Sequence, residues 1–489
     1  MEKSILITTP IYYVNDKPHI GHAYTTLAVD VLTRFFKLQK KEVFFLTGTD
    51  EHGAKITETA RALGITPKEL CDKNSELFKV AWKNLNINYD YFIRTTDKHH
   101  EKAVKKFVEK LKEKNAIYEK EYEGLYCTGC EKFLTEKELI DGLCPDHRTK
   151  PEKISEKNWF FKLKDYLKTI EELIKTDRLD IEPGFAKNEV LGLLKQGLED
   201  FSISRQKERV KWGIDVPFDE NQIIYVWVDA LLNYYTGNST KKFKEYWEKG
   251  KVIHLLAKDI LKFHAIFWPA MLLAVGEKTP DEEFIHGFFT INGQKMSKTL
   301  GNVIDPNEIV GRFGVDATRY LLLSQFPFGH DGDVQESRFI EKYNADLANG
   351  LGNLVARVLT LATKLKIKSP RPRQTKRGGQ KLKVIDKNIK DKISKTQKNY
   401  EKDMQNFRLY EALEEIWKLI SFCDGYIEQE KPWKNPKPEK IINNLLYCIS
   451  EIADLIMPFL PETSEKIKNQ IKESLTSKSQ KTEILFPRI

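Results

Sequence analysis

Two histidines lie three residues apart near the start of the chain, at a place where a helix is expected to begin. They belong to the segment Pro18-His19-Ile20-Gly21-His22, and proline suits the first turn of a helix. That turn carries free N–H groups and the positive end of the helix dipole, which attract phosphate. Imidazole donors at i and i+3 share one helix face, and Gly21 lets a flat base or ribose approach the backbone. The pattern indicates a nucleotide site, although two surface histidines in a turn would show the same spacing.

A second group of polar residues lies on a predicted loop at 295–299, with the sequence KMSKT. It follows a predicted strand and the turn residues Asn292-Gly293. Lys295 and Lys298, with the hydroxyls beside them, could close over a triphosphate and neutralise a leaving pyrophosphate. A lysine pair of this spacing is usually a solvated surface, but its occurrence after the histidine segment favours the catalytic interpretation.

Four possible metal ligands occur within about 20 residues of one another. Cys127 and Cys130 form a CxxC pair, and Cys144 and His147 form a CxxH pair. Three thiolates and one imidazole at this spacing are typical of a closed, tetrahedral structural zinc site. A redox dithiol or separate thiols are the alternatives. Because all four ligands would come from the protein, no coordination position would remain open for catalysis.

The elements around these residues predict a parallel α/β core. Ser4–Thr9 and Val43–Gly48 have the pattern of buried strands, and Ala23–Gln39 repeats apolar residues at helical spacing between them. Strand, helix and strand within about 50 residues form a parallel βαβ unit. Further strands of the same sheet are predicted at 223–228, 252–256 and 284–291, separated by helices such as 259–274.

The last third of the chain is predicted to be a helical bundle. Apolar stripes of helical period run from Leu409 to Ile427 and from Ile442 to Ile456, and Pro432 and Pro458 follow them. The predicted division of the chain is 1–114 and 216–290 for the catalytic core, 115–215 for an inserted subdomain, 291–340 for the KMSKT region, and 341–489 for the helical domain.

Length and composition exclude several classes of protein. The 489 residues, 40% hydrophobic, suggest about three folded units and are too apolar for a disordered chain. No apolar run reaches the roughly 20 residues of a membrane span, and the N-terminus does not resemble a secretion signal. Six cysteines are too few for a disulfide framework. The cytoplasm is the expected location.

The net charge of +9 is distributed unevenly. Residues 341–489 carry 29 Lys and Arg against 19 Asp and Glu, whereas the other 340 residues carry 51 against 52. Nine of the basic residues lie in 364–383 without an acidic one. Such asymmetry favours a nucleic-acid partner for the C-terminal third, and a general enrichment in lysine is the alternative.

Together, these segments resemble a known family. HIGH at 19–22 and KMSKT resemble the two signatures of class I aminoacyl-tRNA synthetases. The flanking sequence is similar to methionyl-tRNA synthetases from Ile5 to the closing LFPR at 485–488. The segments that carry this similarity are TPIYYVN at 9–15, TDEHG at 49–53, YVWVDA at 225–230, Asp259-Ile260 and Phe263-His264.

The resemblance implies a Rossmann-type parallel-sheet catalytic domain with an inserted zinc-knuckle subdomain, followed by an all-α anticodon-binding bundle. It implies a methionine pocket formed by Ile11, Tyr13, Trp227, Ala230, Tyr234, Ile260, His264 and Trp268, with Asp50 receiving the substrate ammonium. Around ATP it implies His19, Gly21, His22, Asp259, Lys295, Ser297 and Lys298. In the helical part, Asn353, Arg357 and Trp433 match positions that read the CAU anticodon. Without the resemblance, Trp227 and Trp268 would be read as core residues and Trp433 as a cap of the bundle.

The sequence departs from the family pattern at a few positions. Thr299 replaces the usual serine and keeps the hydroxyl, whereas Ala257 and Leu231 stand where glycine and proline occur in some members, which puts the local backbone in question. Only one set of zinc ligands is present, as in the single-knuckle branch. The chain ends at Ile489 without the appended domain through which some relatives dimerise, which predicts a monomer.

The reaction implied is the activation of methionine by ATP, with Mg²⁺, to methionyl-adenylate and pyrophosphate, followed by transfer to the terminal adenosine of tRNA(Met). The motifs leave two alternatives. A synthetase for Ile, Leu or Val would need a long editing insertion for which the chain has no room, and one for Cys a single open zinc site. A non-catalytic RNA-binding relative is disfavoured by the intact histidines and lysines.

Overall fold

The structure is a computed structural model. It describes every residue except 1–3, 128–131, 135, 146–147, 292, 297–301, 366–384 and 475–482. The chain divides into two compact units. The first contains most residues up to His286, and the second contains Gly287–Ile489 together with Asp30–Phe35 and Asn84–Asn86.

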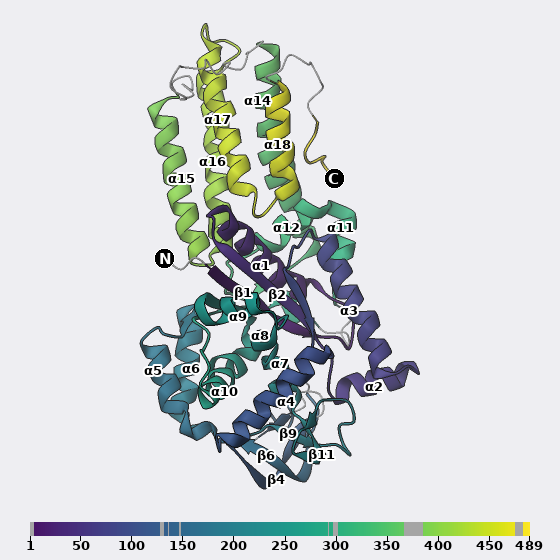
Figure 1. The fold of residues 1–489 in the computed structure, drawn as a ribbon. Coiled ribbons are helices and arrows are strands. Elements are labelled where there is room, and N and C mark those ends of the chain that lie inside the picture. The colour runs from purple at the N-terminus through teal and green to yellow at the C-terminus, as the bar shows by residue number, and fades with distance from the viewer. Residues whose placement is uncertain are drawn as a thin grey trace. The chain divides into compact units, whose positions relative to one another are not determined.

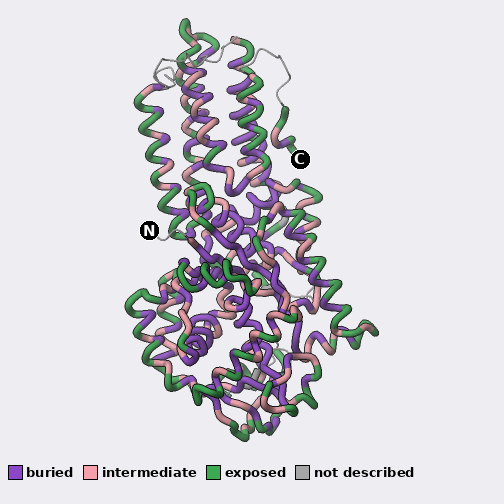
Figure 2. Tube along the Cα trace, in the orientation of Figure 1, coloured by how far each residue is buried: buried purple, intermediate pink, exposed green. Residues whose placement is uncertain are grey.

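A six-stranded parallel sheet forms the centre of the first unit (Figure 1). Its strand order is β3-β2-β1-β12-β13-β7, and each neighbouring pair is parallel. The buried central strands appear as purple tube in Figure 2. The predicted parallel α/β core, with strands at 4–9, 43–48 and 252–256, is therefore confirmed. The strands are β1 (Ser4–Tyr13), β2 (Glu42–Asp50), β3 (Tyr91–Arg94), β7 (Asp180–Glu182), β12 (Lys251–Ala257) and β13 (Glu282–His286).

Helices connect these strands. α1 (Ile20–Leu38) joins β1 to β2, as predicted, and its apolar face is buried because residues such as Leu27 and Val31 recur every three to four positions. The other helices of the first unit are α2 (Ala54–Leu63), α3 (Pro67–Asn84), α4 (Lys98–Glu113), α5 (Leu167–Lys175), α6 (Gly184–Gln196), α7 (Val226–Leu231), α8 (Asn233–Thr236), α9 (Lys241–Lys249) and α10 (Trp268–Val275).

Two smaller sheets lie in the first unit. One has the order β5-β4-β6-β8, and the other β10-β11-β9. The region predicted as an insertion also contains β7, which pairs with β13 at the edge of the main sheet. The strands are β4 (Ile117–Cys127), β5 (Lys132–Leu134), β6 (Glu152–Phe161), β8 (Phe201–Ser202), β9 (Ser204–Gln206), β10 (Asp215–Val216) and β11 (Asp219–Ile224), with short turns η1 (Glu136–Glu138) and η2 (Leu163–Asp165).

The prediction of a main-sheet strand at 223–228 is wrong, because the strand there ends earlier and belongs to another sheet. β11 ends at Ile224 and pairs with β9 and β10 instead of the main sheet, and Val226–Leu231 form helix α7. The residues Ile-Ile-Tyr-Val-Trp-Val have high strand propensity, but Asp229 makes buried hydrogen bonds to two histidines from other elements. Tertiary contacts therefore override propensity here.

Two other predictions are corrected. The strand expected at 284–291 is divided between β13 and β14 (Phe289–Ile291), which belong to different sheets. Gly287 lies in the break, where a Cβ atom would come within 2.2 Å of the His330 backbone. The helix expected at 259–274 consists of a 3₁₀ turn η3 (Lys258–Ile260), a π-helical segment η4 (Phe263–Phe267) and α10.

The second unit is mostly helical. The two predicted amphipathic helices are confirmed as α16 and α17, and an all-α region closes the chain. No helix among the described residues is both long and apolar enough to cross a membrane. The elements are β15 (Gln294–Lys295), α11 (Pro306–Phe313), α12 (Val315–Leu323), β16 (Gly332–Asp333), α13 (Glu336–Lys342), the π-helix η5 (Tyr343–Gly352), α14 (Asn353–Lys364), α15 (Lys387–Gln405), α16 (Leu409–Glu430), α17 (Pro438–Ile456) and α18 (Pro461–Ser474).

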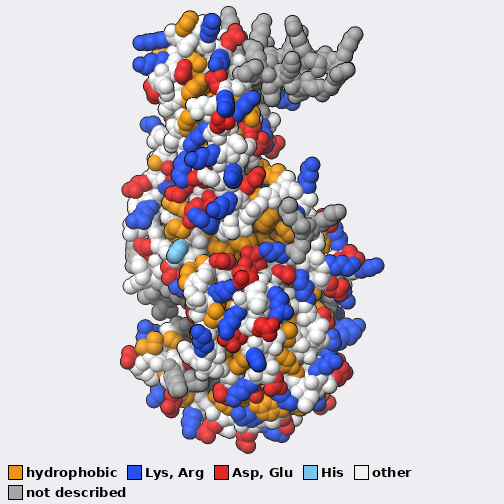
Figure 3. Space-filling view, turned by 90° about the vertical axis from the view of Figure 1, so that its left-hand side faces the viewer, with side chains coloured by type: hydrophobic (Ala, Val, Ile, Leu, Met, Phe, Trp, Pro, Cys, Tyr) orange, Lys and Arg blue, Asp and Glu red, His pale blue; other side chains and the backbone are white. Residues whose placement is uncertain are grey.

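The basic excess of the C-terminal third is concentrated in two sequence segments. Ten of its 29 Lys and Arg, and none of its 19 Asp and Glu, belong to 366–384 and 475–482. The rest of 341–489 is therefore electrically neutral. On the face drawn in Figure 3, basic and acidic side chains are interspersed over the described residues.

Arg319 of α12 is the centre of a buried hydrogen-bond network in the second unit. Its side chain is fully buried and donates to Asp30 Oδ2 at 2.8 Å, to the Leu85 carbonyl at 3.0 Å and to the Phe459 carbonyl at 2.7 Å. The guanidinium thereby joins segments of the unit that are far apart in sequence. Because burying a cation without its partner costs free energy, this network is expected to contribute strongly to the stability of the fold.

Candidate functional site

The histidine turn has the predicted position at the start of α1. The His19 and His22 rings stack with centroids 3.7 Å apart, and both side chains are partly exposed. The Gly21 amide donates to His19 Nδ1 at 3.1 Å, and the His19 amide donates to His22 Nδ1 at 3.3 Å. In the neutral rings this places both protons on Nε2. Two imidazole donors are thus held side by side at a helix N-terminus, an arrangement suited to binding phosphate.

Tyr12 supports this turn from β1. Its hydroxyl exchanges a 2.7 Å hydrogen bond with Thr26 Oγ1, and its ring lies 4.8 Å from the His22 ring. Phe78 of α3 stacks on Tyr12 and also contacts His22. The orientation of His22 is therefore determined by buried aromatic neighbours.

Three predicted pocket residues lie at the carboxyl ends of β1, β2 and β12, where ligands bind in open α/β sheets: Tyr13, Asp50 and Ile260. Asp50 is the last residue of β2 and is 9% exposed. Tyr234 and Trp268 belong to the hydrophobic core, and other predicted pocket residues pack on the same cluster. These packed residues are Ile11, Tyr13, Trp227 and Ile260.

A polar pair forms one side of this cluster. His264 Nδ1 lies 2.9 Å from the Ile260 carbonyl, to which it donates, and His264 Nε2 accepts from the Tyr234 hydroxyl at 2.8 Å. Burial lowers the pKa of His264 to about 4. The ring is therefore neutral at pH 7, and the pair suits an uncharged, polarisable group such as a thioether.

Aromatic rings surround this pair. The Trp227 and Phe263 rings are nearly parallel with centroids 4.0 Å apart, and the Tyr234 ring lies 6.2 Å from Trp268. Ala230 of α7 is buried, and Ala257, which stands where some members of the family have glycine, has the ordinary extended angles φ −82° and ψ 153°. Alanine therefore imposes no strain at the end of β12. Asp259 is exposed in η3.

The sequence interpretation missed a buried acid–histidine cluster next to Asp50. Asp229 of α7 accepts from His52 Nδ1 at 2.7 Å and from His100 Nε2 at 2.8 Å, and all three side chains are buried. Burial lowers the pKa of His52, but the charge of Asp229 and its hydrogen bond outweigh burial, so the pKa is raised. Burial raises the pKa of Asp229, and the two histidines lower it by more. The sequence did carry a signal for this cluster. His52 in TDEHG and Asp229 in YVWVDA are ionisable residues in otherwise largely apolar surroundings.

Two of the four predicted zinc ligands lie within the described residues. Cys127 ends β4, and Cys144 lies in the following loop; both are buried and pack with Leu134. Thr149 contacts both, because its carbonyl accepts from the Cys144 amide at 2.9 Å and its hydroxyl lies 3.9 Å from Cys127 Sγ. Two cysteines from separate segments therefore belong to one small buried cluster. Cys130 and His147 lie outside the described residues.

The KMSKT segment belongs to the second unit. Lys295 is in β15, which pairs with β14 across a turn where Gly293 has φ 73°. Asp333 Oδ1 accepts from the Gly293 amide at 2.6 Å and from the Thr290 hydroxyl at 2.9 Å. These bonds fix the base of the loop. The Lys295 side chain, Ser297 and Lys298 lie outside the described residues.

The residues predicted to read the anticodon lie close together in the second unit. Asn353 is the first residue of α14 and is exposed, and Arg357 lies one turn later. The Arg357 guanidinium lies over the Trp433 ring, 5.6 Å from its centroid, and also pairs with Glu428. Trp433 is 47% exposed, so one part of its indole surface is available to a partner.

Comparisons with known proteins agree with this geometry. The family model "tRNA synthetases class I (M)" matches residues 5–153 and 146–359, and "Anticodon-binding domain of tRNA ligase" matches 386–486. A methionine–tRNA ligase of Caldanaerobacter subterraneus is 43% identical over all of this chain and 79% of its own length. That of Thermotoga maritima is 40% identical over 95% of this chain and 75% of its own length. The structure of Mycobacterium tuberculosis methionyl-tRNA synthetase with methionyl-adenylate matches with TM-score 0.88 and 33% identity, covering 99% of both chains.

Proposed function

Because the chain belongs to the methionyl-tRNA synthetase family, we propose that it is an ATP-dependent methionine–tRNA ligase. It activates methionine to methionyl-adenylate and then transfers the methionyl group to the terminal adenosine of tRNA(Met). The observation that carries the proposal is the joint presence, in the unit built on the parallel sheet, of the stacked histidine turn that follows β1 and the buried, hydrogen-bonded Tyr234–His264 pair. A monomer in the cytoplasm, with the domain boundaries given above, belongs to the same proposal.

Adenylate formation needs position and charge stabilisation more than a protein nucleophile. The methionine carboxylate attacks the α-phosphorus of ATP, and the bond to pyrophosphate breaks. Donation from the Nε2 atoms of His19 and His22 stabilises charge on the phosphoryl oxygens. Lys295, Ser297 and Lys298 bind the leaving pyrophosphate, and Gly21 and Asp259 complete the ATP site. Mg²⁺ bound with ATP supplies further charge neutralisation.

Methionine is held by its two ends. Asp50 binds the ammonium, which leaves the carboxylate directed to the nucleotide. The thioether lies against the neutral Tyr234–His264 pair and packs against apolar and aromatic side chains, since sulfur interacts well with ring edges. The packing residues are Ile11, Tyr13, Trp227, Ala230, Ile260 and Trp268.

A structural zinc ion is proposed for the four-ligand group of Cys127, Cys130, Cys144 and His147. Supporting it are the burial and approach of Cys127 and Cys144, together with the spacing of the other two. Elemental analysis is expected to find one zinc per chain. Chelation should loosen the 115–215 region first and spare ATP binding, which limited proteolysis and nucleotide titration would measure. Zero or two zinc ions would contradict the assignment.

The decisive experiment is ATP–pyrophosphate exchange with a panel of amino acids. Exchange that depends on methionine, and not on Ile, Leu, Val or Cys, is expected. Charging of tRNA transcripts should then require the CAU anticodon, read through Asn353, Arg357 and Trp433. Exchange with another amino acid would favour a sibling synthetase, and no exchange with any would favour a non-catalytic RNA-binding protein.

A further inference from the structure

Two hydrogen-bonded pairs of ionisable side chains hold the residues that directly follow Asp50. We propose that Glu51–Arg94 and His52–Asp229 are positioning pairs, which fix the backbone at the end of β2 so that the Asp50 carboxylate is oriented for the substrate ammonium. This inference rests on the proposed function, and it adds residues that do not themselves touch the substrate.

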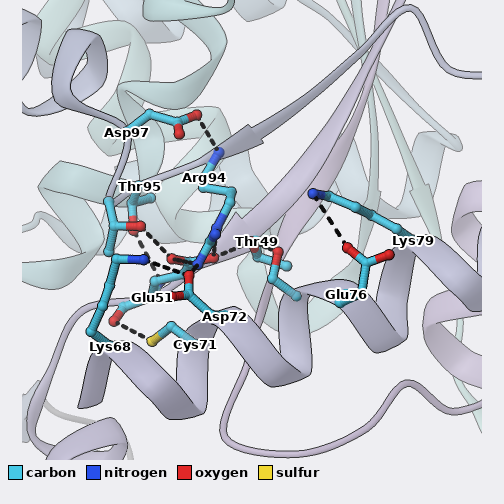
Figure 4. Close-up of polar contacts among 12 residues, drawn as sticks. Thr49, Glu51, Lys68, Cys71, Asp72, Glu76, Lys79, Arg94, Thr95 and Asp97 are labelled. Carbon is cyan, nitrogen blue, oxygen red and sulfur yellow. Dashed lines mark hydrogen bonds and ion pairs between the residues drawn. The ribbon is translucent and has the colours of Figure 1, made fainter. Parts of the chain in front are cut away.

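The Glu51 side chain is fully buried, and both of its carboxylate oxygens are bound. Arg94 of β3 donates from Nε to Oε1 at 2.6 Å and from a terminal nitrogen to Oε2 at 2.9 Å, which is a bidentate pair (Figure 4). Thr49 and Thr96 hydroxyls donate to the same two oxygens at 2.7 and 2.5 Å. The Glu51 carboxylate is therefore saturated and neutralised by protein groups.

The Glu51 backbone is held as well. Its amide donates to Thr95 Oγ1 at 2.9 Å, and its carbonyl accepts from Trp212 Nε1 at 2.5 Å and from Cys71 Sγ at 3.3 Å. Burial and the charge of Glu51 raise the pKa of Cys71, so its thiol keeps the proton that it donates. Three separate segments of the chain thus hold the Glu51 backbone in a single orientation.

The next residue, His52, is held by side chains of α7 and β1. His52 Nδ1 binds Asp229, whose second oxygen binds His100, and the His52 carbonyl accepts from the Tyr13 hydroxyl at 2.8 Å. Asp229 lies on α7 between Trp227 and Ala230, two proposed methionine contacts. The same pair therefore connects the ammonium end of the pocket with the thioether end.

Stability alone is a poor explanation for these pairs. Replacing a buried ion pair by apolar residues of similar size is often neutral or stabilising, because the desolvation of both charges is costly. Two hydrogen-bonded pairs on consecutive residues next to Asp50 are instead suited to holding the backbone at the end of β2 in one conformation. Arg94 also donates to Asp72 Oδ1 at 2.6 Å, so its charge is shared between Glu51 and Asp72, and Asp50 is the proposed anion that meets the ammonium.

The test uses full-length protein and the variants Arg94→Gln, Arg94→Lys and Asp229→Asn. KM and kcat are measured by ATP–pyrophosphate exchange, and inhibition constants are measured for the desamino analogue of methionine, which keeps the thioether and the carboxylate. Arg94→Gln is expected to lower kcat/KM for methionine by about 10- to 100-fold with an unchanged KM for ATP, because misplacement by about 1 Å has effects of this size. Asp229→Asn should act in the same direction. Affinity for the desamino analogue should stay within about twofold, since it has no ammonium to misplace.

Lys79→Gln is the matched control. It breaks the partly exposed Lys79–Glu76 pair of α3, which spans 3.7 Å (Figure 4), and the contact of Lys79 with the Phe92 ring at 5.3 Å, and should change neither constant. If Arg94→Gln does not fold, Arg94→Lys keeps the charge but loses the bidentate geometry, and a smaller, methionine-selective loss is expected. Equal losses for methionine and its desamino analogue, or none in the folded variants, would overturn the inference. Absence of methionine-dependent exchange in the wild type would instead overturn the proposed function.

Discussion

Trp433 allows the proposed anticodon contact to be separated from stability. Its indole is 47% exposed, and the Arg357 guanidinium lies 5.6 Å from the ring centroid. Stacking of one base on an aromatic ring is worth about 1–3 kcal/mol, so Trp433→Ala is expected to lower tRNA charging about 5- to 150-fold in kcat/KM. Amino-acid activation, measured by pyrophosphate exchange, should be nearly unchanged because it needs no anticodon.

The same substitution also removes packing, and its size can be worked out. A tryptophan buries about 150–250 Å² when fully enclosed, so roughly half of that, at about 25 cal/mol per Å², gives an upper bound of about 2–3 kcal/mol. Phe185→Ala in α6 is the control, because Phe185 has the same exposed fraction of 47%. It should lose stability without losing tRNA discrimination. The Arg357–Trp433 contact adds about 0.5–1 kcal/mol, as a double-mutant cycle would measure.

Charging of transcripts with altered anticodons completes the assay. Trp433→Ala should narrow the difference between CAU and other anticodons, whereas neutralising lysines in 364–383 should weaken all RNAs alike and lower the salt dependence. The reasoning is refuted if Trp433→Ala depresses exchange, charging and the free energy of unfolding together. Trp433 would then be a structural cap of the helical bundle.

Three further outcomes are expected. Lys298→Ala should lower the rate of adenylation by about 10²–10³-fold, or 2.7–4 kcal/mol, with little change in methionine affinity, and an unchanged single-turnover rate would remove the loop from the mechanism. Arg319→Met should lower the free energy of unfolding by about 3–5 kcal/mol because the buried Leu85 and Phe459 carbonyls lose their donor and Asp30 loses one of its arginine partners, and a loss below 1 kcal/mol in urea denaturation would contradict this. The pKa of His52 is raised in the folded state, so its stabilisation is complete below about pH 6.5 and is lost as the pH rises through the raised value. The difference in unfolding free energy between wild type and His52→Gln should therefore shrink from pH 6 to pH 9, and a constant difference would show that the pair does not titrate.

Much of the fold could be predicted because its signals are local. The apolar residues of α1, α16 and α17 recur at helical spacing, and those of β1 and β2 form short continuous runs. Such patterns depend on residues a few positions apart, which the sequence displays directly. The family motifs also belong to this class, since each is a short contiguous segment.

The errors occur where distant contacts decide the outcome. Residues 223–228 have strand propensity, but Asp229 is bound by His52 from the loop after β2 and by His100 from α4, and a helix forms instead. β7 lies within the predicted insertion but joins the main sheet. Its partner there, β13, lies about 100 residues later in the sequence. No local pattern encodes such pairing.

By itself, the sequence determined the type of fold, the family and the candidate residues of each site. Only the tertiary structure decided which of them meet. Arg357 and Trp433 approach each other from helix α14 and from the turn after α16, and Glu51 meets Arg94 across 43 positions of sequence, as His52 meets Asp229 across 177. The energy of a buried ion pair depends on distance and desolvation in space, and these follow from the path of the whole chain rather than from neighbouring residues.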